Sequence, residues 1–154
     1  MNEPHVIDVV VVDDHPLFRR GITSLLETLD GVHVVGSASS VAEAIEVVER
    51  THPAVVLMDL DLGDGQSGID ATRSVVRRRP ETAVLVLTML GDDQSLFAAI
   101  SAGARGYLLK VASPGEVERA IRAVADGDVL FGADVAARAG AVMRGAPAAQ
   151  RPGP

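Results

Sequence analysis

The chain has 154 residues, of which 47% are hydrophobic and 23% are charged, and its formal net charge at neutral pH is −7. This length and apolar content predict one globular domain with a buried core and exclude a disordered chain. The absence of cysteine excludes disulfides and thiolate metal sites, and the excess of acidic residues argues against a nucleic-acid-binding surface in the main domain.

The sequence carries no signal for export or membrane insertion. No apolar run approaches the ~18 residues that a membrane-spanning helix requires. The first residues, Met1–Asp8, contain acids and a proline instead of the basic region of a signal peptide. We therefore expect a cytoplasmic protein without a membrane partner.

Five short apolar runs alternate with five amphipathic segments along the chain. The runs are rich in valine and leucine and mostly do not alternate with polar residues, which is typical of strands buried on both faces of a parallel sheet. These predicted strands are Val6–Val12, Val32–Val35, Ala54–Met58, Ala83–Leu87 and Gly106–Leu109. The predicted helices follow them, with apolar stripes that begin at Leu17, Val41, Ile69, Leu96 and Val117.

This order predicts an α/β fold, a doubly wound sheet of five parallel strands with helices on both faces. We expect residues 1–131 to form this domain. In residues 132–154 the sequence predicts a short helix over 132–144, followed by a linker rich in alanine, proline and glycine. In such sheets the carboxyl ends of the strands lie along one edge, where ligands bind.

Polar side chains follow four of the five predicted strands. Asp13–Asp14 follow the first strand, Asp59 ends the third with Asp61 just beyond it, and Thr88 ends the fourth. Lys110, the only lysine in the chain, follows the fifth. We expect these residues to meet at one edge of the sheet.

A cluster of this composition is suited to phosphoryl chemistry. Neighbouring carboxylates repel one another unless a cation lies between them, and hard oxygen ligands suit Mg²⁺. A carboxylate beside the metal can act as a nucleophile and form an aspartyl phosphate, while a lysine stabilises the charge of the transferred group. The residue types alone therefore predict Mg²⁺-dependent phosphoryl transfer to Asp59.

Four motifs carry a resemblance to a known family. They are Val9–Pro16 (VVVVDDHP), Val56–Asp59 (VLMD), Val84–Thr88 (VLVLT) and Gly106–Lys110 (GYLLK). In this order they resemble the receiver domain of bacterial two-component response regulators, and the first and last resemble its NarL/FixJ (LuxR-type) subfamily. The resemblance covers about residues 6–127 and implies a flavodoxin-like strand order of 2-1-3-4-5.

The resemblance implies a role for each residue at the sheet edge. Asp59 would accept the phosphoryl group from a sensor histidine kinase. The expected Mg²⁺ ligands are the carboxylates of Asp13, Asp14 and Asp59 and the backbone carbonyl of Asp61.

Three further residues would read out the phosphorylation. Thr88 and Lys110 would contact the phosphoryl oxygens, and Tyr107 would be the switch aromatic that turns inward when Thr88 moves toward the phosphate. The protein would be a signalling switch and not a turnover enzyme. Subfamily members usually bind DNA through a C-terminal helix-turn-helix, which we do not find in these residues, so we expect a truncated regulator or a stand-alone receiver. A homodimer is possible.

Two alternatives use the same segment. Asp59 and Asp61 after an apolar strand also resemble the nucleophile motif of haloacid-dehalogenase-like phosphatases, in which the second aspartate is a general acid–base. Gly63–Gly68 matches the glycine spacing of a dinucleotide-binding loop but lacks the acid expected ~20 residues further on. The loop Gly63–Gly68 also lacks the proline that the family usually has there and is one residue longer than in the family. His15 is expected only to open the first helix.

Overall fold

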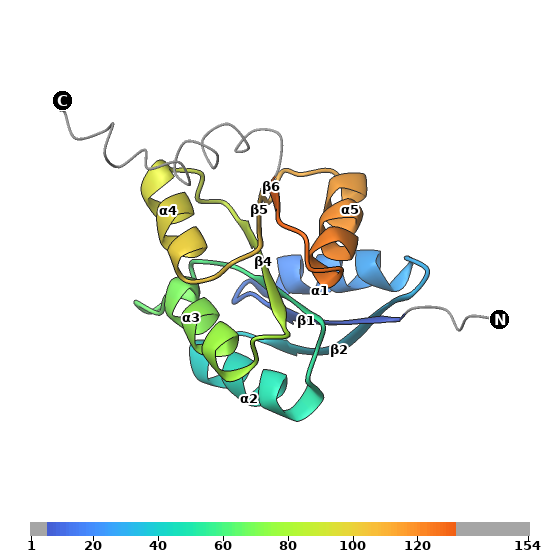
Figure 1. The fold of residues 1–154 in the computed structure, drawn as a ribbon, viewed down its shortest axis with the longest axis horizontal. Coiled ribbons are helices and arrows are strands. Elements are labelled where there is room, and N and C mark those ends of the chain that lie inside the picture. The colour runs from blue at the N-terminus through green and yellow to red at the C-terminus, as the bar shows by residue number, and fades with distance from the viewer. Residues whose placement is uncertain (1–5, 132–154) are drawn as a thin grey trace.

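A computed structural model describes residues 6–131 and places them in one α/β domain (Figure 1). The six parallel strands form a single sheet in the order β2-β1-β3-β4-β5-β6. The strands are β1 (Ile7–Val12), β2 (Val32–Ala38), β3 (Val55–Met58), β4 (Ala83–Thr88), β5 (Gly106–Leu109) and β6 (Leu130–Phe131). The helices are α1 (Pro16–Glu27), α2 (Val41–Thr51), α3 (Gly68–Arg78), α4 (Asp93–Ser101) and α5 (Pro114–Ala125). The short helix and linker expected in 132–154 lie outside the described residues.

The predicted fold class and strand order are confirmed, with one addition. The sheet has a sixth strand, β6, in which Leu130 and Phe131 pair with Gly106 and Tyr107 of β5. A strand of two residues has no periodicity from which it could be predicted, and only its pairing with β5 defines it. Strand β2 also runs three residues beyond its apolar run, to Ala38, after a register shift opposite Val9 and Val10.

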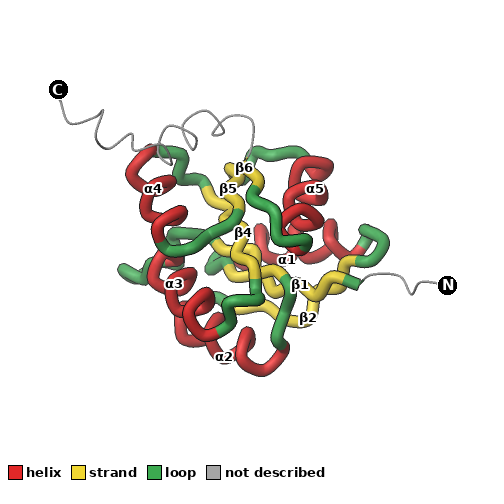
Figure 2. The backbone as a smooth tube through the Cα atoms, in the orientation of Figure 1, coloured by secondary structure: helices red, strands yellow, loops and turns green. Residues whose placement is uncertain are grey.

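Helices cover both faces of the sheet (Figures 1 and 2). On one face, Val10 and Val12 of β1 belong to a core that includes side chains from α2, α3 and α4. On the other face, Val9 and Val11 pack in a second core with α1 and α5. Every residue of β3 and β4 is buried, which explains why these strands read as unbroken apolar runs.

Side-chain caps fix where the helices begin, and therefore which residues stay in the loops at the sheet edge. Ser40, Ser67, Asp92 and Ser113 each accept a hydrogen bond from a backbone N–H in the first turn of α2, α3, α4 and α5. Helix α1 begins differently, with His15 as the N-cap residue and Pro16 in its first turn. The expectation that His15 opens the first helix is thus confirmed.

Within residues 6–131, no helix is both long enough and apolar enough to cross a membrane.

The capping box of α5 provides a test of this local architecture. The Ser113 hydroxyl accepts from the Glu116 N–H at 3.1 Å, and the Glu116 carboxylate accepts from the Ser113 N–H at 2.9 Å. We expect Ser113→Ala to lower the free energy of unfolding by about 1 kcal/mol, because it removes the hydroxyl acceptor. Urea unfolding followed by circular dichroism measures this change.

The matched control is Ser24→Ala, at an exposed position within α1. Alanine is the better helix former there, so its stability should be unchanged or slightly raised. Equal effects of the two substitutions would contradict a capping role for Ser113.

Candidate functional site

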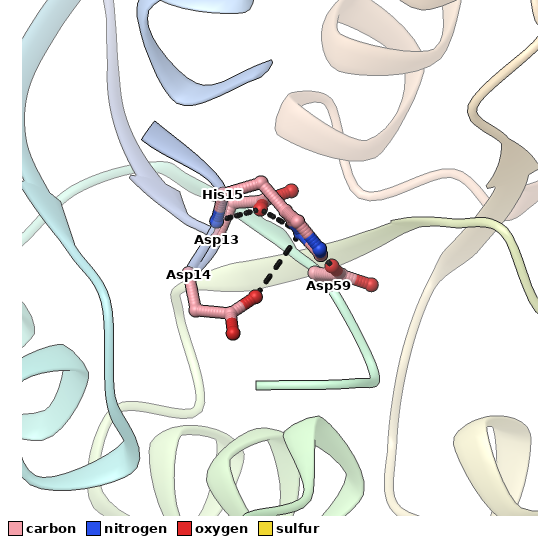
Figure 3. A group of neighbouring side chains, drawn as sticks. All are labelled: Asp13, Asp14, His15 and Asp59. Carbon is pink, nitrogen blue, oxygen red and sulfur yellow. Dashed lines mark hydrogen bonds and ion pairs between the residues drawn. The ribbon is translucent and has the colours of Figure 1, made fainter. Parts of the chain in front are cut away.

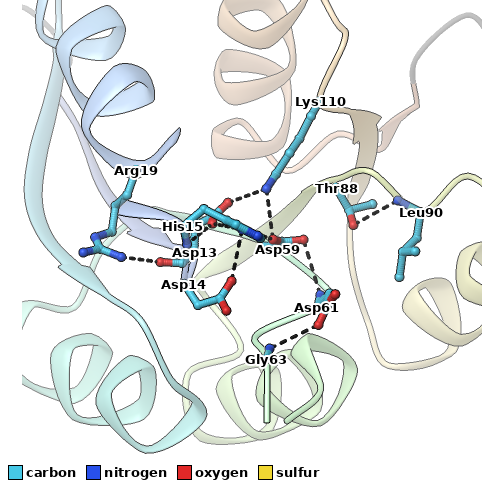
Figure 4. Close-up of polar contacts among 10 residues, drawn as sticks. All are labelled: Asp13, Asp14, His15, Arg19, Asp59, Asp61, Gly63, Thr88, Leu90 and Lys110. Carbon is cyan, nitrogen blue, oxygen red and sulfur yellow. Dashed lines mark hydrogen bonds and ion pairs between the residues drawn. The ribbon is translucent and has the colours of Figure 1, made fainter. Parts of the chain in front are cut away.

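The carboxyl ends of β1, β3 and β5 bring together side chains that are distant in the sequence. Asp13 and Asp14 follow β1, Asp59 follows β3 and Lys110 follows β5. Because these strands are all parallel, their ends lie along the same edge of the sheet, and the four side chains converge there (Figure 4).

Lys110 lies between two buried carboxylates. Its Nζ is 2.7 Å from Asp13 Oδ2 and 3.0 Å from Asp59 Oδ2. The Lys110 side chain is only 8% exposed, and Asp13 and Asp59 are buried. The ammonium also lies 4.3 Å from the centre of the Phe18 ring. Lys110 therefore pairs with both carboxylates at once, and these charge-assisted hydrogen bonds hold the three charged groups in a fixed arrangement.

The pKa of Lys110 reflects this competition between burial and charge. Burial is the largest influence and by itself lowers the pKa, because it disfavours the charged form. The hydrogen bonds and charges of Asp13 and Asp59 together outweigh burial, so the pKa lies above its ordinary value of 10.5. Lys110 is therefore cationic throughout the physiological range.

The acidic residues form a cluster that fits a divalent cation. One ligand atom from each of Asp13, Asp14, His15 and Asp59 lies within 4.8 Å of the others (Figure 3). Asp14 Oδ1 is buried without a hydrogen-bond partner, and Asp13 Oδ2 has only the ion pair with Lys110. Carboxylate oxygens gathered at one edge of the sheet are the donor set that a hard cation prefers.

His15 has a second role, which the sequence analysis missed. Beyond opening α1, its imidazole lies in the acidic cluster, with Nδ1 3.1 Å from both Asp13 Oδ1 and Asp14 Oδ1. Arg19 was missed as well: its Nη1 donates to the backbone carbonyl of Asp13 at 2.6 Å. Their spacing after Asp13 places both residues at the start of α1, but only the orientation of that helix brings them to the site.

Asp61 turns its carboxylate away from the cluster. Its Oδ1 accepts a hydrogen bond from the Gly63 N–H at 3.1 Å, which closes a local turn (Figure 4). Its own N–H donates to Asp59 Oδ1 at 3.3 Å. The Asp61 side chain thus supports the loop and is not placed as a general acid beside Asp59.

The glycine-rich loop is shaped by close contacts with the site. Gly63 has φ +75°, and a Cβ there would lie 2.6 Å from Asp14 Oδ2. A Cβ on Gly68 would lie 2.0 Å from the carbonyl oxygen of Asp59. Gln66 ties the loop to α2, since its Oε1 accepts from the Val41 N–H at 2.9 Å. Gly63 thus lets the loop approach the Asp14 carboxylate, and Gly68 lets it approach the Asp59 backbone, so both glycines have a structural reason that involves no dinucleotide.

Thr88 and Tyr107 meet at the backbone of one residue, Leu90. The Thr88 hydroxyl accepts from the Leu90 N–H at 3.2 Å, and the Tyr107 hydroxyl donates to the Leu90 carbonyl. Both side chains are buried, so the Tyr107 ring already lies inward while Thr88 is bonded to Leu90. Thr88 ends β4 and so lies at the same edge of the sheet as the acidic cluster, but its hydroxyl is hydrogen-bonded to Leu90 (Figure 4). The role of Leu90 was not predicted, because both hydrogen bonds use its backbone atoms, which are the same in almost every residue type.

The fold and the site together define a class of protein. Residues 9–122 match the family model of the response regulator receiver domain. The chain belongs to this family, whose members act as signalling switches rather than as turnover enzymes, and its relatives are NarL/LuxR-family regulators.

Several relatives show how much of a longer protein the chain spans. It is 38% identical over 123 residues to the oxygen regulatory protein NreC of Staphylococcus carnosus, covering 80% of this chain and 57% of NreC. It is 39% identical over 147 residues to the transcriptional activator DevR/DosR of Mycobacterium tuberculosis, covering 96% of this chain and 67% of that protein. The chain thus spans about three fifths of the length of such relatives.

Solved structures agree with this assignment. A LuxR-family two-component response regulator from Aurantimonas has a TM-score of 0.83 and 33% identity, and the match covers 90% of this chain and 99% of that one. The receiver domain of the response regulator NarL from Mycobacterium tuberculosis has a TM-score of 0.74 and 34% identity, covering 80% of this chain and 99% of that one. The family assignment and the outward turn of Asp61 both argue against the phosphatase alternative.

The contact at Gly68 predicts a large effect for a small substitution. We expect Gly68→Ala to lower the free energy of unfolding by about 2 kcal/mol, because the new methyl group overlaps the Asp59 backbone. Urea unfolding measures the change. Gly21→Ala is the control: it lies inside α1 with nothing within 4 Å, so alanine should stabilise by about 1 kcal/mol. A neutral result at Gly68 would contradict this packing.

The ion pairs of Lys110 predict a second effect, which depends on pH. We expect Lys110→Met to cost about 2 kcal/mol in EDTA at neutral pH, because two buried carboxylates lose their cation. Since the pKa of Lys110 is raised, its contribution is complete below pH 10.5 and is lost as the pH rises through the folded-state value. As the pH is raised from neutral, the difference between wild type and variant in urea unfolding should therefore persist until strongly alkaline pH.

The control for Lys110 is Arg73→Met, which removes an exposed ion pair of 3.1 Å with Asp70. Such surface pairs contribute at most about 0.5 kcal/mol. A cost at Lys110 no larger than that at Arg73 would show that the buried pairs do not stabilise the fold.

Proposed function

We propose that this domain is a phosphorylation-controlled switch in which a sensor histidine kinase transfers a phosphoryl group to Asp59. The observation that carries the proposal is the position of Asp59: a buried carboxylate at the end of β3, 3.0 Å from the only lysine and within the acidic cluster. A nucleophile flanked by a fixed cation and by further carboxylates is suited to phosphoryl transfer.

The reaction is an in-line displacement at phosphorus. A carboxylate oxygen of Asp59 attacks, an O–P bond forms, and the N–P bond to the kinase histidine breaks, so the imidazole leaves with the electron pair. Lys110 binds the phosphoryl oxygens and neutralises part of their charge, since its Nζ already lies beside Asp59 Oδ2. The hydroxyl of Thr88 is the second group that we assign to a phosphoryl oxygen.

We assign the cation to the carboxylates of Asp13, Asp14 and Asp59 and to the backbone carbonyl of Asp61. The oxygen donors favour Mg²⁺, and the buried Asp14 Oδ1 accepts no hydrogen bond from the backbone. When bound, Mg²⁺ screens the repulsion between the incoming phosphoryl group and these carboxylates.

The readout that we propose begins at Thr88 and ends at Tyr107. If Thr88 turns toward the phosphoryl group, its hydroxyl leaves the Leu90 N–H. Because the Leu90 carbonyl accepts from the Tyr107 hydroxyl, a shift of this peptide reaches the switch aromatic directly. A local change of about two charges is thereby coupled to the segment between β4 and α4.

The rim of the site offers a surface for the kinase. Three apolar side chains around it are strongly exposed, Leu17 at 85%, Val111 at 76% and Met89 at 70%. Exposed apolar side chains grouped around a reactive centre are typical of a contact surface, and a phosphohistidine on a second protein must approach this edge to reach Asp59. These side chains are suited to bind a partner of mixed polar and apolar character.

We further propose that residues 1–131 act as the receiver and 132–154 as the connection to a DNA-binding domain of a cytoplasmic transcription regulator. The support comes from relatives: LiaR of Bacillus subtilis is a transcriptional regulatory protein and is 35% identical over 133 residues. A homodimer is proposed on the same basis, since a structure of RcsB shows two dimers bound to two parallel DNAs.

The test is intact-mass spectrometry after incubation with acetyl phosphate. In the presence of Mg²⁺ we expect the mass of one phosphoryl group to be added, and EDTA should abolish the addition. Asp59→Asn should gain no such mass, because an amide is not a nucleophile here. Asp61→Asn is the matched control and should still be modified, since its carboxylate is turned toward Gly63.

Two results would contradict the proposal. One is an adduct that persists in Asp59→Asn, which would place the phosphoryl group elsewhere. The other is multiple turnover of the donor without an adduct, lost in Asp61→Asn, which would favour the phosphatase chemistry.

A further inference from the structure

The imidazole of His15 occupies the centre of the acidic cluster. Its Nδ1 is 3.1 Å from Asp13 Oδ1, 3.1 Å from Asp14 Oδ1 and 3.9 Å from Asp59 Oδ2 (Figure 3). The His15 side chain is 61% exposed, so it is not forced into this position by core packing. Its Nδ1 faces the acids, although most of the side chain is in contact with solvent.

A single hydrogen bond accounts for only part of this arrangement, because Nδ1 is hydrogen-bonded to Asp13 Oδ1 at 3.1 Å and lies equally close to Asp14 Oδ1. A neutral imidazole carries at most one proton on Nδ1, which cannot point at both Asp13 Oδ1 and Asp14 Oδ1. Asp13 Oδ1 also accepts from the His15 backbone N–H at 2.8 Å, whereas the buried Asp14 Oδ1 has the His15 ring nitrogen as its ion-pair neighbour. One ring nitrogen thus faces two carboxylate oxygens at the same distance.

The same spacing suits three ligands of one metal ion. Ligands with bonds of about 2.1 Å at right angles lie about 3.0 Å apart. The two distances of 3.1 Å from Nδ1 to the carboxylates match that spacing. Lys110 does not compete for these atoms, because it pairs with Oδ2 of Asp13 and Oδ2 of Asp59. The oxygens of Asp13 are thus divided between a lysine side and a histidine side.

We infer that His15 is an additional metal ligand, through Nδ1, and that it shifts the site from Mg²⁺ toward first-row transition-metal ions. Mg²⁺ prefers oxygen donors, whereas an imidazole nitrogen strengthens binding of ions such as Co²⁺, Ni²⁺ and Zn²⁺. A site with carboxylates and one imidazole therefore binds these ions more tightly than a site of carboxylates alone. This inference rests on the cation site assigned under the proposed function.

The variant that tests it is His15→Phe. Phenylalanine fills a similar volume without a nitrogen, and the His15 side chain makes no hydrogen bond as the N-cap of α1, so the helix start is retained. The matched controls are His33→Phe, whose ring is exposed and 3.7 Å from Asp8, and His5→Phe.

Two measurements use Co²⁺ and Mg²⁺ as probes at one fixed pH. By isothermal titration calorimetry, His15→Phe should weaken Co²⁺ binding at least about tenfold. Its Mg²⁺ affinity should change by less than about threefold, and the control variants should match wild type. Proton NMR of the Co²⁺ complex should show a hyperfine-shifted imidazole N–H signal that excess Mg²⁺ removes and that His15→Phe lacks.

Two results would overturn the inference. Equal losses of Co²⁺ and Mg²⁺ affinity in His15→Phe would show that the ring acts only by shaping the carboxylates. A wild-type Co²⁺ complex without a shifted imidazole signal would show that Nδ1 does not bind the ion. If neither ion binds wild type, the cation site of the proposed function fails as well. If His15→Phe still gains a Mg²⁺-dependent phosphoryl group, any loss of Co²⁺ binding is separate from the switch.

Discussion

The arrangement of this site depends on one interaction, the pairing of the Lys110 ammonium with aspartate carboxylates at the carboxyl edge of the sheet. Parallel strands bring Asp13, Asp14 and Asp59 within a few ångströms of one another, and carboxylates so placed repel unless cations lie between them. Lys110 supplies one such cation from β5, held in place by Phe18 and by burial. The site thus gathers like charges that one lysine partly neutralises, and the cation and phosphoryl group that we propose for it would complete this balance.

The loops around the site contact its residues mainly through their backbone atoms. Gly63 and Gly68 permit close approach to Asp14 and to the Asp59 carbonyl. The Asp61 carboxylate closes its own turn, so an acid beside the nucleophile is used for structure instead of proton transfer. The peptide of Leu90 plays a comparable part on the other side, where it joins Thr88 to Tyr107.

The assignment of His15 shows how one residue can serve fold and chemistry together. As the N-cap of α1 it needs only an extended backbone, and its side chain is therefore free to turn toward the carboxylates. Because helix α1 begins immediately after Asp13 and Asp14, any residue at this position lies beside the cation site. The identity of that residue then influences which ions the site prefers, without changing the sheet that places the aspartates.

The sequence by itself determined the order of strands and helices and the placement of Asp13, Asp14, Asp59, Thr88 and Lys110 at the carboxyl ends of the strands. Buried apolar runs and the polar residues that end them are local signals, which is why they could be predicted. The tertiary structure decided what depends on distance and orientation. It paired the two-residue strand β6 with β5, turned Asp61 toward Gly63, placed His15 among the carboxylates and linked Thr88 to Tyr107 through a peptide. Backbone hydrogen bonds and side-chain directions of this kind arise only when the packed elements fix where each chain segment lies, so no pattern of residue types encodes them.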